Sequence, residues 1–133
     1  MNVQFSIRHV TGVTIFDLSG RLVASNEEES LHAALIQSAA DGRRWILVNC
    51  AGLTLVDSAG LGEIVAAHAA VVRRGGVVRL LQPTPRLSEL LALTRLDSLF
   101  EIFLDETEAL ASFNALNNLR TQQKLAQYLR EDH

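Results

Sequence analysis

The residues best suited to chemistry are an aspartate and a serine, Asp57 and Ser58, which two glycines, Gly60 and Gly62, follow closely. They lie in residues 54–62, between an apolar run typical of a buried strand and a longer apolar pattern typical of a helix. Either polar side chain can cap the first turn of that helix. Because glycines carry no side chain, we expect the Ser58 hydroxyl to be open to solvent. The segment is therefore interpreted either as a helix cap alone or as a serine that another protein modifies.

A serine hydrolase is the first enzyme class to consider for an exposed serine. The local sequence V-D-S-A-G lacks the first glycine of the G-x-S-x-G turn, because Val56 occupies that position. A hydrolase also needs a base within hydrogen-bonding distance of the serine. His68 follows about 15 Å further along the same predicted helix, where we expect a core histidine with satisfied hydrogen bonds. His9 and His32 come from other elements, and the sequence excludes neither of them as a base. A hydrolase therefore stays a third hypothesis, and we predict that the protein is not an enzyme.

Nucleotide and metal sites find little support in the sequence. Gly60-Leu61-Gly62 is half of a dinucleotide fingerprint, which is a weak signal alone. No G-x-x-x-x-G-K-[ST] loop occurs, and Lys124, the one lysine, lies near the end of the sequence. The acidic residues are scattered, and no two histidines stand four residues apart as a helical metal site requires. We therefore expect no cofactor and no bound metal.

The composition predicts one folded domain. The chain has 133 residues, of which 48% are hydrophobic and 20% charged, as in ordinary globular domains. A net charge of −3 with mixed signs argues against nucleic-acid binding. The single cysteine, Cys50, lies in an apolar strand, so we expect a core residue and neither a disulfide nor a zinc site.

The N-terminal segment and the hydropathy pattern indicate the cellular compartment in which the protein is expected. Residues 1–10 are neither basic nor apolar enough for a signal peptide. No apolar run approaches the roughly 18 residues that a membrane-spanning helix needs. We therefore expect a cytoplasmic protein without membrane contact.

The first third of the chain predicts a hairpin followed by a helix. Hydrophobic residues alternate with polar ones over residues 3–8, and the alternation resumes from Val13, with Gly20 ending or bending the second strand. Ser25 and Glu28 stand at capping-box spacing, which predicts the start of a helix. Asp41-Gly42 predicts its end.

The rest of the chain alternates strands with helices. Strands are predicted at 45–50, 77–81 and 99–104, and helices follow residues 54–62, Pro85 and Asp105. Gly75-Gly76 ends the central helix. This order predicts an α/β fold, a mixed sheet with an N-terminal hairpin, parallel βαβ units and about four helices.

The composition becomes polar after Leu116, with asparagine and glutamine dominating. We expect a domain over residues 1–116 and a polar helical extension or tail over 117–133. Leu125, Tyr128 and Leu129 are spread among its polar residues. A homodimer formed through this extension is one hypothesis for its role.

Three segments together resemble a known family. They are L-V-N-C-A-G-L-T-L-V-D-S-A-G-L-G at 47–62, R-R-G-G at 73–76 and L-D-E-T-E-A-L at 104–110. The sequence resembles a STAS domain of the anti-sigma factor antagonist family over roughly residues 3–116.

This resemblance implies regulation by partner switching. Members bind an anti-sigma factor that is a serine kinase, and phosphorylation of the serine after the motif's aspartate breaks the complex. A metal-dependent phosphatase then resets the antagonist, and ATP with its metal ion belongs to the kinase. That serine corresponds to Ser58, and Ala59 replaces a second Ser or Thr that the family often has. The partner-binding residues implied here are Thr54, Asp57, Ser58, Ala59, Gly60 and Gly62.

One position departs from the family pattern. In the family's G-x-L-D segment, Val23 stands in place of an aspartate that resembles part of the partner-facing surface. We expect the glycines of the motif to let the kinase's nucleotide site approach the backbone, and Leu61 to anchor the helix in the core. The alternative hypothesis is a constitutive STAS adaptor in a lipid-transport or stress-sensing complex, where Ser58 is a contact or a cap.

Overall fold

The structure is a computed structural model that describes residues 3–23 and 31–131, so the capping box predicted at Ser25 and Glu28 lies outside the described residues. The strands are β1 (Gln4–Val10), β2 (Val13–Leu22), β3 (Trp45–Val56), β4 (Val77–Leu81) and β5 (Ile102–Phe103). The helices are α1 (Leu31–Ala40), α2 (Ser58–Arg73), α3 (Pro85–Leu93) and α4 (Glu106–Glu131), with a 3₁₀ turn, η1, at Leu96–Ser98.

The five strands form one mixed sheet in the order β1-β2-β3-β4-β5. The hairpin of β1 and β2 is antiparallel, whereas β2 through β5 run parallel. Parallel neighbours need crossover connections, and α1, α2 and α3 supply them. The predicted fold class is therefore confirmed.

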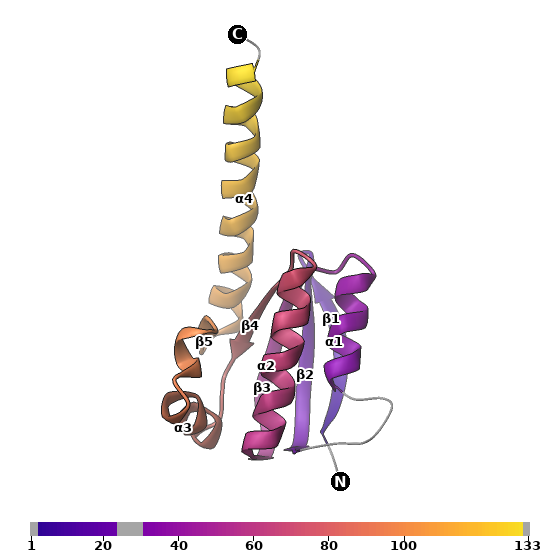
Figure 1. The fold of residues 1–133 in the computed structure, drawn as a ribbon, viewed down its shortest axis with the longest axis vertical. Helices are drawn as coiled ribbons and strands as arrows, with labels where there is room; N and C mark the ends of the chain where they lie inside the picture. The colour runs from indigo at the N-terminus through magenta and orange to yellow at the C-terminus, as the bar shows by residue number, and fades with distance from the viewer. Residues whose placement is uncertain (1–2, 24–30, 132–133) are drawn as a thin grey trace.

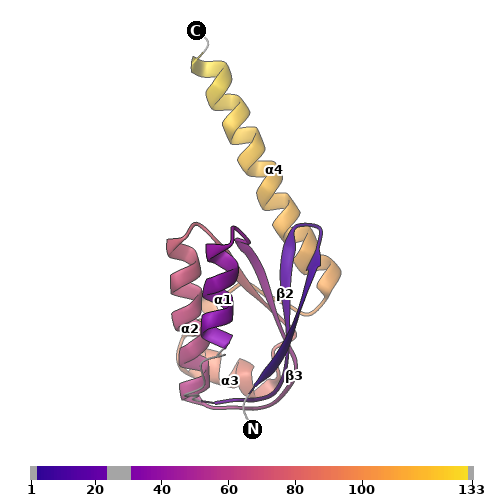
Figure 2. The same ribbon diagram turned by 90° about the vertical axis from the view of Figure 1, so that its right-hand side faces the viewer.

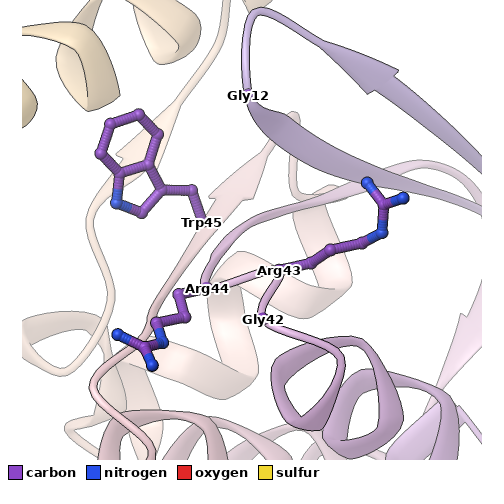
Figure 3. A pocket seen from close by; sticks show the side chains of 5 residues that line it. All are labelled: Gly12, Gly42, Arg43, Arg44 and Trp45. Carbon is purple, nitrogen blue, oxygen red and sulfur yellow. The ribbon is translucent and has the colours of Figure 1, made fainter.

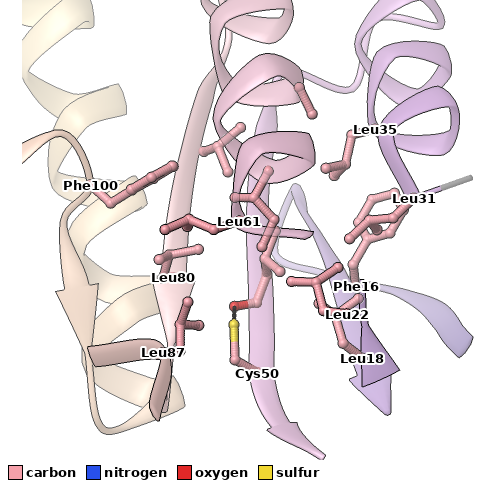
Figure 4. Packing of buried hydrophobic residues seen from close by; sticks show 14 of the residues in the cluster. Phe16, Leu18, Leu22, Leu31, Leu35, Cys50, Leu61, Leu80, Leu87 and Phe100 are labelled. Atoms are coloured by element: carbon pink, nitrogen blue, oxygen red, sulfur yellow. Dashed lines mark hydrogen bonds between the residues drawn. The ribbon is translucent and has the colours of Figure 1, made fainter. Parts of the chain in front are cut away.

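The sheet buries a different cluster on each face. Helices α1 and α2 pack against one face, where the larger core includes Phe16, Leu35, Cys50 and Leu61 (Figures 1 and 4). Cys50 is fully buried, as predicted, and burial raises the pKa of its thiol to about 12. The first turns of α4 cover part of the other face, with Phe113 packed near Trp45.

Two strands extend beyond their predicted ends. β3 continues past Cys50 to Val56, and β2 passes through Gly20 to Leu22, because the two strands stay paired after register shifts. A Cβ on Gly52 would lie 2.5 Å from the Leu18 carbonyl oxygen, so glycine permits the close approach there. Because of this extra pairing, residues 51–56 belong to β3, and no loop of that length precedes α2.

The last strand is shorter than the predicted 99–104. Only Ile102 and Phe103 pair with β4, because η1 occupies the preceding residues and turns Phe100 into the larger core. The helix predicted after Pro85 is confirmed, with Thr84 as its N-cap.

The contacts between helix α4 and the sheet that involve described side chains lie near the start of the helix. The Arg8 side chain binds both Asp17 of β2 and Glu106 of α4, and Arg79 lies 4.7 Å over the Phe113 ring. Beyond these turns α4 projects past the sheet, away from the end where α2 begins (Figures 1 and 2). None of the helices in the described ranges combines the length and apolar character needed to cross a membrane.

Candidate functional site

The start of α2 is held by an aspartate cap. Asp57 has extended backbone angles, φ −116° and ψ 175°, and its Oδ1 accepts a hydrogen bond of 2.8 Å from the Gly60 N–H. Its backbone N–H donates to the Leu22 carbonyl at 3.2 Å, which joins the cap to the end of β2. The sequence allowed either Asp57 or Ser58 as the cap, and the structure assigns that role to Asp57.

Ser58 is consequently not needed to cap helix α2. It is the first residue of α2 and is exposed, and its hydroxyl forms no hydrogen bond with any residue in the described ranges. Ala59 beside it is also exposed. An unbonded hydroxyl at a helix start lies among backbone N–H groups that favour negative charge.

The two glycines of the motif have different surroundings. Gly60 is buried, and a Cβ there would lie 2.0 Å from the Leu22 carbonyl oxygen and 2.9 Å from the Val23 nitrogen. Gly62 is exposed, with nothing within 4 Å of a built Cβ. The idea that both glycines open the backbone to a partner is therefore wrong for Gly60, which lets α2 approach β2. Leu61, only 2% exposed, anchors α2 in the core as predicted.

Thr54 lies on the strand that leads to the cap. It is exposed, and its hydroxyl donates to the Gly20 carbonyl at 3.1 Å. Its neighbour Leu55 is 44% exposed and is paired with exposed Arg21 across the two strands. The exposure of Leu55 and Arg21 beside Thr54 was not expected from the sequence, because a leucine in an apolar strand predicts a core position.

No histidine serves Ser58 as a base among the residues that the structure describes. His68 packs on Phe100 with ring centroids 4.7 Å apart, and burial lowers the pKa of its imidazole. Its buried Nδ1 has no hydrogen-bond partner in the described ranges, so the prediction of a satisfied core histidine is wrong. His9 Nδ1 lies 3.2 Å from the Thr14 hydroxyl, on the hairpin.

Metal ligands do not gather at this site. Across residues 3–23 and 31–131, no group of three or more histidine, cysteine, aspartate or glutamate side chains is arranged to hold an ion. Among the described residues, the start of α2 therefore combines an exposed serine hydroxyl with an aspartate cap and has no cluster of metal ligands.

Comparison with known proteins identifies the domain family. The family model of the STAS domain matches residues 4–109. The chain belongs to the STAS domain family. The Anti-sigma F factor antagonist of Paenibacillus polymyxa is 26% identical over 119 residues, which cover 88% of this chain and 100% of that protein.

Solved structures share the fold of this STAS domain. The unphosphorylated form of the anti-sigma factor antagonist SpoIIAA superposes with a TM-score of 0.71 at 22% identity, covering 84% of this chain and 97% of that one. Its phosphorylated form from Bacillus gives 0.66 at 22%, covering 83% and 99%. An anti-sigma factor antagonist from Mycobacterium paratuberculosis gives 0.71 at 19%, covering 84% and 93%.

The accessible residues at the start of α2 form one small surface of this STAS domain. We call it the Ser58 surface, and its exposed members from the predicted site are Thr54, Asp57, Ser58, Ala59 and Gly62. Val23, half-buried, lies at its border, because its nitrogen adjoins Gly60. The departure from the family pattern at Val23 therefore falls beside Gly60 in the first turn of α2.

Proposed function

We propose that this STAS domain is an anti-sigma factor antagonist that binds an anti-sigma serine kinase through the Ser58 surface. Phosphorylation of Ser58 releases the kinase, and a serine phosphatase restores the antagonist, so that sigma-factor-dependent transcription follows the state of one residue. The observation that carries this proposal is the exposed, unbonded Ser58 hydroxyl, which is available because Asp57 provides the cap.

The chemistry belongs to the partners, and this chain supplies the acceptor. The kinase transfers the terminal phosphoryl group of ATP to Ser58 Oγ, the hydroxyl proton leaves, and ADP is the product. The phosphatase uses water to release inorganic phosphate and regenerate the hydroxyl. ATP and its metal ion are held by the kinase, so this domain needs no cofactor of its own.

The phosphate affects the interface more than the fold. It adds about 1.5 to 2 negative charges beside Asp57, and the N-terminus of α2 stabilises anions. A partner's negative group about 5 Å away, at an effective dielectric of about 20, is repelled by about 3 kcal/mol per unit charge. That repulsion corresponds to about a hundredfold loss of affinity, which is enough to release a partner.

The relatives support this proposal by their names. Both the Paenibacillus polymyxa relative and SpoIIAA are anti-sigma factor antagonists, and SpoIIAA has been solved in unphosphorylated and phosphorylated forms. A regulator of this kind acts on transcription in the bacterial cytoplasm through protein–protein contacts.

The direct test is phosphorylation by the cognate kinase with ATP, followed by intact-protein mass measurement. Wild type is expected to gain one phosphate and Ser58→Ala none. A wild-type protein that stays unmodified, or a Ser58→Ala variant that gains the same phosphate, contradicts the proposal. Equal recovery of a partner by wild type and Ser58→Asp would instead support the constitutive adaptor.

We also propose that the projecting part of α4 pairs with a second copy of the chain. Leu125 and Leu129, one helical turn apart, are 57% and 54% exposed. Sedimentation of wild type is expected to show a dimer that Leu125→Gln with Leu129→Gln abolishes. Leu93→Gln on α3, where the leucine is 71% exposed, is the matched control. A monomeric wild type, or a dimer that survives the double variant, would refute this pairing.

A further inference from the structure

The end of the domain opposite the Ser58 surface carries four exposed arginines, two in the loop after α1 and two at the end of α2. Arg43 and Arg44 follow α1, whereas Arg73 ends α2 and Arg74 is its C-cap. The loops that follow the two helices touch, because the Val77 N–H donates to the Arg44 carbonyl at 2.7 Å. Helix α2 separates Ser58 from Arg73 by about 22 Å at its usual rise per residue.

The positive charge of these loops is not neutralised by the described residues. The ion pairs between described residues engage Arg8, Arg79 and Arg86, and none involves the four arginines of this end. Asp41 is the acid nearest in sequence to Arg43, and it accepts a hydrogen bond from Gln37. The chain as a whole carries −3, so this concentration of arginine is local. The Arg43 guanidinium donates one hydrogen bond of 3.2 Å to His9 Nδ1, which adds no negative charge, and helix C-termini favour cations such as Arg73 and Arg74.

A pocket of about 330 Å³ lies among these loops, lined by Gly12, Gly42, Arg43, Arg44 and Trp45. The Trp45 ring stands on one side, and the Arg43 and Arg44 side chains extend to either side of the backbone between them (Figure 3). A Cβ on Gly12 would lie 3.9 Å from the Trp45 ring, in ordinary contact, so the glycine leaves that flank uncovered. The volume is at the lower limit of known ligand pockets, about 300 Å³.

We propose that this arginine end, formed by Arg43, Arg44, Arg73, Arg74 and the Trp45 pocket, binds an acidic segment of a partner protein. Carboxylates of the segment pair with the guanidinium groups, which match carboxylate geometry through paired N–H donors. One apolar or aromatic side chain between those carboxylates enters the pocket and packs against Trp45. This binding is independent of the Ser58 surface, and the two ends can be occupied together.

The distribution of charge favours a protein segment over nucleic acid. A duplex is bound by a basic stripe along a face or a helix, in a domain that is basic overall. Here four of the twelve basic residues gather at one end of a net acidic chain, and the other eight are spread along the rest of the sequence. A pocket that accommodates a single side chain between arginines suits a short peptide segment with mixed acidic and apolar character.

Trp45 is the only tryptophan of the chain, so its fluorescence reports occupancy of the pocket. The probe is a synthetic peptide with glutamates on both sides of one phenylalanine, capped at both ends. Wild type is expected to show a saturable change in Trp45 emission, with affinity that falls as salt rises. Arg43→Ala with Arg44→Ala is expected to bind at least tenfold more weakly.

The matched control is Arg21→Ala with Arg86→Ala, which removes the same charge from exposed arginines elsewhere and should leave affinity unchanged. Because the Arg44 contact to Val77 uses its backbone, the test variant is expected to fold, and Arg73→Ala with Arg74→Ala provides a second, independent variant. No saturable change in wild type overturns the proposal. Equal weakening in the control, or tighter binding of a short DNA duplex than of the peptide, also overturns it.

Discussion

The two ends of α2 use polar residues in opposite ways. At its start, Asp57 binds the first turn and leaves Ser58 with a free hydroxyl. At its end, the Arg74 N–H completes the backbone bonds to Val71 and Val72, and the arginine side chains point to solvent without a described ion-pair partner. In both places backbone or cap contacts complete the helix, so Ser58, Arg73 and Arg74 stay exposed to solvent. If this difference is correct, substitutions at residues that hold the helix should lower stability, whereas substitutions at exposed residues should change binding and leave stability nearly unchanged.

The largest loss of stability is expected from Gly60→Ala, which changes a buried position in the first turn of α2. The new Cβ would lie 2.0 Å from a backbone carbonyl that cannot move without shifting β2. We expect a loss of about 3 kcal/mol or more in the free energy of unfolding, at the upper end of overpacking. Urea denaturation measures it, with Gly62→Ala as the control.

Gly62 is open, so Gly62→Ala should gain up to about 1 kcal/mol from helix propensity. If Gly60→Ala and Gly62→Ala unfold at the same urea concentration, the expectation that only the buried glycine is needed for close packing of α2 on β2 is wrong.

Ser58→Asp places a negative charge at an exposed position in the same turn of α2. We expect up to about a hundredfold weaker binding of the kinase because of charge repulsion at the interface. The free energy of unfolding should change by less than about 1 kcal/mol, since the helix N-terminus tolerates an anion. Affinity is measured by calorimetry, and Ser88→Asp, at an exposed serine of α3, should bind like wild type. Weakening by both variants would point to a nonspecific effect of charge.

Asp57→Ala should lower the free energy of unfolding by about 1 kcal/mol, because the Gly60 N–H loses its acceptor. Asp57→Asn keeps an acceptor oxygen and should restore most of the loss. Thermal unfolding checks both variants. If the alanine variant is as stable as wild type, Asp57 is not the residue that holds the turn, and Ser58 becomes the candidate cap.

Arg8 shows what an arginine does where the chain supplies carboxylates. Its hydrogen bonds lower the pKa of both Asp17 and Glu106. Carboxylates with lowered folded-state pKa values contribute stability that is present above their unfolded pKa, about 4, and lost as the pH falls through the folded values. Arg8→Gln should cost about 1 kcal/mol or less at pH 7, because the side chains are 29–40% exposed. Urea denaturation as a function of pH should show the difference vanishing in acid, and a constant difference would refute the ion pairing.

The smallest effect belongs to the arginine end. Arg43→Ala with Arg44→Ala should change the free energy of unfolding by less than about 0.5 kcal/mol, because both side chains are exposed and the side-chain hydrogen bond lost is the exposed one from Arg43 to His9. Urea denaturation at neutral pH provides the measurement. A loss as large as that of Arg8→Gln would show that these arginines hold the fold and are not free for a partner.

Local pattern predicted most of the fold. The alternation at Phe5 and Ile7, the apolar run after Trp45 and the stop at Gly75-Gly76 each reflect the geometry of one element, and the element order implies the parallel sheet. Leu61 was also placed in the core from helical spacing alone. The exposed position of Ser58 followed from its place between a strand and a helix.

Only the tertiary structure shows which residues around α2 stabilise the fold and which are exposed to solvent. The full length of β3 depends on its pairing with β2, and the burial of Gly60 depends on Leu22, far away in sequence. The choice of Asp57 over Ser58 as the cap required the actual backbone angles. The arginine end unites two loops that the sheet brings together. Periodicity encodes which side of an element is apolar, whereas strand register and helix packing determine which distant residues meet.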